Sequence, residues 1–167
     1  MAKIKDITDS LESIAPKAYQ EEYDNSGLIV GDPSADVQGI LFSLDCIEAI
    51  IDEAIAKNCN LIIAHHPIVF RGLKQFNGKN YVERTVIKAI KNDIAIYAIH
   101  TNLDNVHNGV NKKISDKLGL LNTRILVPKK SLLNKLEVFI PKGDTDKVIE
   151  AMHRSGAGHV GNYSHCS

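Results

Sequence analysis

The chain has 167 residues, of which 44% are hydrophobic and 24% are charged, a composition typical of a globular protein rather than a disordered one. Basic and acidic residues number 20 each, so the net charge of zero provides no basic field for nucleic acid or anionic lipid and argues against nucleic-acid binding. The start of the chain has no apolar signal segment, the longest apolar stretch (94–99) is far below the roughly 20 residues of a membrane helix, and the three cysteines form no CxxC pair; we therefore expect a cytoplasmic protein that does not bind membranes.

The pattern of apolar residues predicts alternating helices and strands. Residues 4–14 carry apolar side chains at three- and four-residue intervals, which predicts a helix that ends before Pro16. Asp45, followed by Glu48 three residues later, is expected to begin another helix that runs to about Lys57. In chain order the expected elements are a helix at 4–14, strands at 28–30 and 39–44, a helix at 45–57, a strand at 60–65, a helix at 82–90, a strand at 94–99 and a helix at 109–118.

This alternation predicts an α/β fold with a mainly parallel sheet flanked by helices. Residues 135–140 then alternate polar and apolar side chains, as in a half-exposed strand, and an amphipathic helix is expected to begin near 143. We place a domain boundary near 129–132. The chain then consists of an α/β domain at 1–130 and an incomplete βα piece of a second, α+β domain at 131–167, which is too short to bury much of a core alone.

Histidines stand at the ends of two predicted strands. His65 and His66 follow the apolar run 60–64, and the run 94–99 ends in the segment 100–104, which contains a histidine and an aspartate. Ligands of open α/β sheets bind beyond the carboxyl ends of such strands. The two strand ends therefore predict a site that combines imidazole and carboxylate groups, which is metal-ligand chemistry.

Side chains of His65 and His66 would point to opposite faces of an extended segment, so one ion could not easily bind both. Two divalent ions (Zn, Mn, Fe, Ni or Mg) bridged by Asp104 would accommodate this arrangement. The alternative is that both histidines are ordinary strand-end residues and Asp104 only caps a helix.

Three roles stay open for His100: it could be a ligand, it could contact a substrate, or it could orient a ligand, and we favour the last. Residues 24–27 are interpreted as a turn. The remaining histidines are interpreted as surface or loop residues: His107, His153, His159 and His165.

Three segments occur in an order and spacing typical of one known family: Tyr23–Gly31, Ala64–Pro67 and His100–Asp104. Together they resemble the GTP cyclohydrolase 1 type 2 homolog family, also called the Ngg-interacting-factor-three-like family. The resemblance implies an α/β fold with a dinuclear metal centre and a toroidal homohexamer in the full-length form. It covers the family's amino-terminal half and, from about residue 135, the start of the domain that longer bacterial members carry as an insert.

The resemblance also implies roles for individual residues. His65 and His66 would bind the two different ions, and Asp104 would be a further ligand. Family members complete the site with a His and a Glu four residues apart near their carboxyl terminus, and no histidine of this chain has a Glu four positions on. The chain is therefore expected to supply three of about five ligands.

Two functional hypotheses follow. The first is a metal-dependent hydrolase of the GTP cyclohydrolase type, with a nucleotide-like or heterocyclic small molecule as its substrate, to which we assign no catalytic residue. The second is a non-catalytic, ring-shaped scaffold or regulatory protein in which the metal site is structural.

Overall fold

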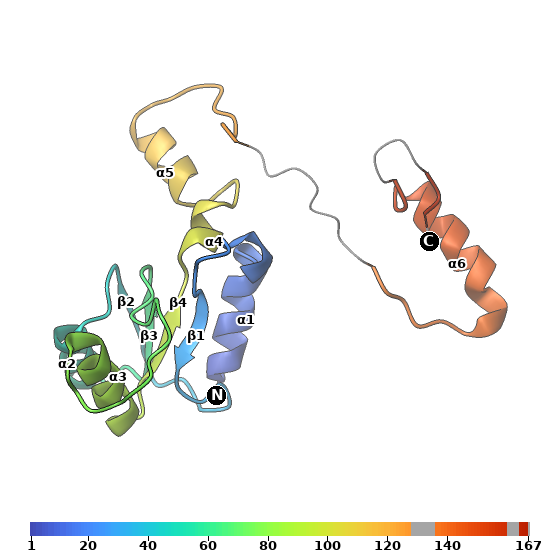
Figure 1. The fold of residues 1–167 in the computed structure, drawn as a ribbon. Helices are drawn as coiled ribbons and strands as arrows, with labels where there is room; N and C mark the ends of the chain where they lie inside the picture. The colour runs from blue at the N-terminus through green and yellow to red at the C-terminus, as the bar shows by residue number, and fades with distance from the viewer. Residues whose placement is uncertain (128–135, 160–163, 167) are drawn as a thin grey trace. The chain divides into compact units, whose positions relative to one another are not determined.

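Figure 1 shows the fold of this computed structural model, which describes residues 1–127, 136–159 and 164–166. The chain divides into two compact units, Met1–Ile125 and Leu126–Ser167. The boundary predicted near 129–132 lies outside the described residues. No helix in the part of the chain that the structure describes is long and apolar enough to cross a membrane.

The first unit is built on a four-stranded sheet with the order β1-β4-β3-β2. Strands β2, β3 and β4 run parallel, and β1 pairs with β4 in the antiparallel direction at one edge. The predicted α/β fold with a mainly parallel sheet is thus confirmed. The strands are β1 (Gly27–Val30), β2 (Ile40–Ser43), β3 (Leu61–Ala64) and β4 (Ala95–Ala98).

Helices cover both faces of this sheet (Figure 1). Alternate residues of the central strand β3 enter two separate cores: Ile62 packs with residues of α2 and α3, and Ile63 packs on the opposite face with residues of α1. Every residue of β3 and β4 is buried, which explains why both strands read as continuous apolar runs. The helices of this unit are α1 (Ile4–Ile14), α2 (Glu48–Ala56), α3 (Tyr81–Lys91), α4 (Thr101–Asp104) and α5 (Val110–Lys117), with a short 3-10 turn at Lys17–Tyr19.

Two helices differ from the prediction. Helix α2 begins at Glu48 with Ile47 as its N-cap residue, so Asp45 does not begin the helix as expected. The Asp45 carboxylate accepts a hydrogen bond from His66 instead. Helix α4 is a single turn that the apolar pattern did not predict, because four residues are too few to show a helical period.

The second unit contains the predicted amphipathic helix, α6 (Thr145–Arg154), preceded by a 3-10 turn at Lys142–Asp144. The strand predicted at 135–140 is absent over Leu136–Ile140, and Lys135 lies outside the described residues. A strand needs a neighbour to accept its backbone hydrogen bonds, and the described residues of this unit contain no other strand.

The centre of the sheet should dominate the stability of the first unit. We expect Ile62→Ala, at a fully buried side chain, to lower the free energy of unfolding by about 2–5 kcal/mol, because it removes buried apolar area and leaves a cavity. The matched control is Ile90→Ala, whose side chain on α3 is 56% exposed and should change stability by no more than about 0.5 kcal/mol. Urea unfolding measures both values, and equal losses would contradict this description of the core.

Candidate metal site

The candidate site lies at the carboxyl ends of β3 and β4. These strands are parallel, and their last residues, Ala64 and Ala98, lie opposite each other. The chain segments that follow the two strands therefore leave the sheet at the same edge. His65 and His66 follow β3 directly, and His100 follows β4 after one further residue.

The structure brings His65, His66 and His100 together. One ring nitrogen from each lies within 4.8 Å of the others, so the three residues are positioned to hold a metal ion. The ring centroids of His65 and His66 are 5.0 Å apart, which corrects the expectation that the two side chains point to opposite faces. That expectation assumed an extended segment, but β3 ends at Ala64 and both histidines lie in a bend.

Each of these three histidines holds its Nδ1 atom against an oxygen acceptor. Carbonyl and carboxylate oxygens only accept hydrogen bonds, so Nδ1 carries the proton and donates it, which leaves the lone pair of Nε2 free. Histidines that bind metals are fixed in this way by their second nitrogen. The pairs are His65 with the Ile99 carbonyl at 2.9 Å, His66 with Asp45 Oδ1 at 2.8 Å and His100 with Asp24 Oδ1 at 2.8 Å.

Asp24 is a fully buried carboxylate beside the site. Besides His100, it accepts hydrogen bonds from the backbone N–H and the hydroxyl of Thr101, from the N–H of Asn25 and from the hydroxyl of Ser26. Burial raises the pKa of this carboxyl, but the hydrogen bonds from Thr101, His100 and Asn25 outweigh burial and lower the pKa from 3.8 to about 2. The segment at 24–27, predicted to be only a turn, therefore orients a histidine of the site.

Two asparagine side chains hold helix α4 against the amino-terminal part of the chain. Asn102 is fully buried; it donates to the Ala15 carbonyl at 2.7 Å and accepts from the His100 N–H at 2.9 Å. Asn105, which follows the helix, donates to the Tyr19 carbonyl at 2.8 Å. The bonds of Asn102 satisfy a polar side chain that would otherwise be costly to bury, and together with the bond of Asn105 they hold the short helix in place.

Asp104 is the last residue of α4. Its Oδ1 atom lies 3.8 Å from His65 Nε2, which is longer than a hydrogen bond. The structure thus places all three predicted ligands at one edge of the sheet, with Asp104 beside the histidine group. Sequence reasoning missed Asp24 and Asp45 as the carboxylates that orient His100 and His66, and for Asp24 the available signal was its position in the segment 23–31.

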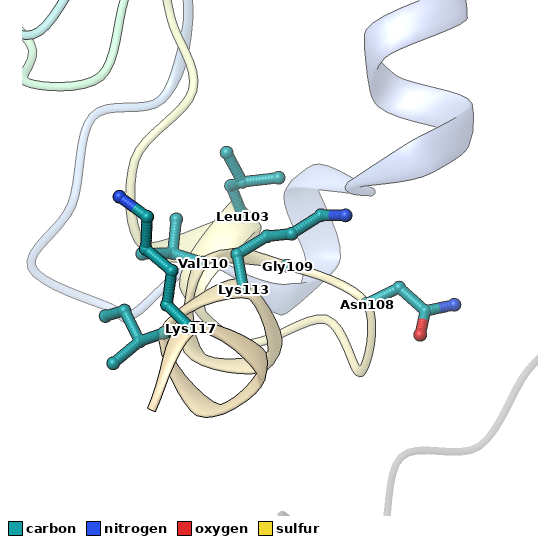
Figure 2. A pocket seen from close by; sticks show the side chains of 7 residues that line it. Leu103, Asn108, Gly109, Val110, Lys113 and Lys117 are labelled. Atoms are coloured by element: carbon teal, nitrogen blue, oxygen red, sulfur yellow. The ribbon is translucent and has the colours of Figure 1, made fainter. Parts of the chain in front are cut away.

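Leu103 contributes to the lining of two hollows. One is lined mostly by apolar side chains, including Phe42 and Leu44, and reaches His65. The other lies between α4 and α5, and Figure 2 shows Leu103, Lys113 and Lys117 in its lining. The second hollow contains none of the three histidines, so the candidate chemistry belongs to the first.

The comparison with protein families decides where this chain belongs. The model of the family described as Duf34/NIF3 (NGG1p interacting factor 3) matches residues 2–165. The chain belongs to the Duf34/NIF3 family. The resemblance inferred from the three sequence segments is thereby confirmed.

Curated relatives in this family bear the name GTP cyclohydrolase 1 type 2 homolog. The proteins of Halalkalibacterium halodurans and Bacillus subtilis are 44% and 43% identical to this chain over 162 residues, which is 96% of the chain. The match spans only 44% and 43% of those relatives, so this chain corresponds to less than half of their length.

Solved structures agree with this assignment. A Bacillus cereus protein related to NIF3 matches with a TM-score of 0.74 at 40% identity, covering 99% of this chain and 46% of that one. Reduced HcgD from Methanocaldococcus jannaschii matches with a TM-score of 0.70 at 31% identity, covering 75% of this chain and 50% of that one.

The lowered pKa of Asp24 predicts a specific loss of stability in acid. A carboxyl whose pKa falls on folding stabilises the folded state above its ordinary pKa of 3.8, and this contribution disappears as the pH falls through about 2. We therefore expect the difference in unfolding free energy between the wild type and Asp24→Asn to shrink as the pH is lowered from about 5 to about 2. Urea unfolding at each pH measures this difference, and a difference that stays constant with pH would contradict the lowered pKa of Asp24.

Proposed function

We propose that this chain is part of a metal-dependent hydrolase that binds two divalent metal ions and acts on a nucleotide-like small molecule. The observation that supports this most is the group of three histidines whose Nδ1 atoms are all engaged and whose Nε2 atoms are free, beside the Asp104 carboxylate. Neutral imidazole and carboxylate groups together suit Zn²⁺, Mn²⁺, Fe²⁺ and Ni²⁺, and the oxygen content also admits Mg²⁺.

The distances fit metal ligation. Two ligands that each lie about 2 Å from one ion are at most about 4 Å apart, and the 3.8 Å between His65 Nε2 and Asp104 Oδ1 falls within this limit. We assign His65 and His66 to different ions and Asp104 as a further ligand, as the family resemblance implies. A carboxylate at this position could bridge the two ions. His100 fits a third nitrogen donor better than the orienting partner expected from the sequence, because Asp24 already occupies its Nδ1.

Divalent ions held by these residues would lower the pKa of a coordinated water and polarise the bond that this water attacks. The chain's own residues would hold the ligand nitrogens in position and leave one side of the site open toward the apolar hollow at His65. The name of the curated relatives supports a nucleotide such as GTP as the class of substrate to test first. We propose that the heterocyclic ring of the substrate binds in the adjacent apolar hollow.

Activity, substrate and assembly belong to the whole protein. The chain matches less than half of the length of the two curated relatives named above, so we propose that the remaining metal ligands come from a carboxyl-terminal half. We also propose a homo-oligomer, the hexameric ring that the family resemblance implies. Nucleic acid stays an unfavoured partner because the net charge is zero. The non-catalytic scaffold with a structural metal site is the outcome if the full-length protein binds metal without turnover.

Metal content tests the ligand assignment directly. We expect a full-length protein to hold close to two divalent ions per chain, and His66→Ala or Asp104→Ala to lose at least one of them. The control is His153→Ala on α6, in the second unit, which should lose none. Elemental analysis of the purified variants measures the ratio, and a full metal complement in Asp104→Ala would show that the site is misplaced.

Turnover tests the proposed reaction class. We expect the full-length protein to convert GTP or a related nucleotide only when Mn²⁺ or Zn²⁺ is supplied, and chelation to abolish the product, because the ions activate the attacking water. Chromatographic detection of the product measures this. A protein that binds metal but forms no metal-dependent product would rule out the hydrolase hypothesis and favour the non-catalytic scaffold.

A further inference from the structure

The two oxygens of Asp24 have separate partners. Oδ1 accepts from His100 Nδ1 and from the backbone N–H of Asn25. Oδ2 accepts from the backbone N–H and the hydroxyl of Thr101 and from the hydroxyl of Ser26. One buried carboxylate therefore contacts both a histidine of the metal site and the first residue of α4.

Helix α4 links this contact to the second half of the site. It runs from Thr101 to Asp104, so its first residue is held by Asp24 and its last residue is the carboxylate beside His65. A four-residue helix has too few internal hydrogen bonds to hold itself. Its position therefore depends on the bond from Thr101 to Asp24 and on the bond from its own buried Asn102 to the Ala15 carbonyl.

The comparable pair at His66 is built differently. Asp45 accepts from His66 Nδ1 at the same distance of 2.8 Å, but 61% of its side chain is exposed, whereas the side chain of Asp24 is completely buried. Water can replace an exposed acceptor, but it cannot replace one that is buried among four other hydrogen bonds.

We propose that Asp24 is a positioning residue of the metal site, which keeps His100 in the tautomer with a free Nε2 and anchors α4 so that Asp104 stays beside His65. The proposal rests on the proposed metal binding for its functional consequence, but the tautomer is a property of the protein without metal. Asp24 itself donates no atom to the ion.

An Asn at position 24 separates these roles because it has one oxygen and one NH₂ group. If its oxygen faces Thr101, its NH₂ group faces His100 Nδ1, which must then give up its proton and accept. The proton moves to Nε2, and a protonated Nε2 cannot bind a metal. If its oxygen faces His100 instead, the Thr101 N–H loses its acceptor.

The test is ¹⁵N NMR of the histidine side chains in the metal-free protein, followed by titration with Zn²⁺. In the wild type we expect His100 to be protonated at Nδ1. In Asp24→Asn we expect His100 to shift to the Nε2-protonated tautomer and the affinity for zinc to fall roughly 10- to 100-fold, the usual effect of removing a residue that orients a ligand.

Two matched variants separate positioning from general destabilisation. Asp45→Asn should change only the signals of His66 and lower zinc affinity less than Asp24→Asn does. Val86→Ala removes buried apolar area on α3, away from this network, and should lower stability yet leave the His100 tautomer and the zinc affinity close to the wild type.

The outcomes are distinguishable. An Nε2-protonated His100 in the wild type, or an unchanged tautomer and affinity in a folded Asp24→Asn, would overturn the proposal, and the wild-type spectrum decides the first point even if the variant fails to fold. Zinc that does not bind to the wild type at all would instead count against the proposed function, while the tautomer measurement would stand by itself.

Discussion

Parallel pairing of β3 and β4 is the constraint on which the candidate site depends. Because Ala64 lies opposite Ala98, the chain after each strand leaves the same edge of the sheet. The imidazole rings of His65 and His66 therefore meet the ring of His100, although His100 lies 35 positions after His65. An antiparallel pair, or a shift of a few residues in register, would separate these side chains. The fully buried apolar strands fix that register, because apolar side chains pack on both of their faces.

Orientation of the imidazoles is a separate requirement, and hydrogen bonds meet it. Each ring could rotate or change tautomer if Nδ1 were free, so the acceptors at Nδ1 determine which nitrogen is presented for a ligand. These acceptors come from three different parts of the fold: the end of β4, the loop before α2 and the loop before β1. The site is therefore a property of the whole first unit.

Sequence reasoning succeeded where the signal is local. The apolar runs predicted β3 and β4, and their ends located His65, His66 and Asp104. It failed where the contact is long-range: Asp24 lies 76 positions before His100, and a local turn pattern does not show which distant side chain the carboxylate contacts. The expectation that the two histidines point to opposite faces failed for another reason, because β3 ends at Ala64, directly before His65.

Burial of Asp24 carries a cost that explains why its network is so complete. A buried carboxylate is unfavourable unless every lone pair finds a donor, and here the donors come from both its own loop and the segment after β4. The donors from His100 and Thr101 reach Asp24 only when the segment after β4 packs against the loop before β1. The orientation of His100 consequently depends on the folding of the first unit, and the fold itself preorganises the histidine group.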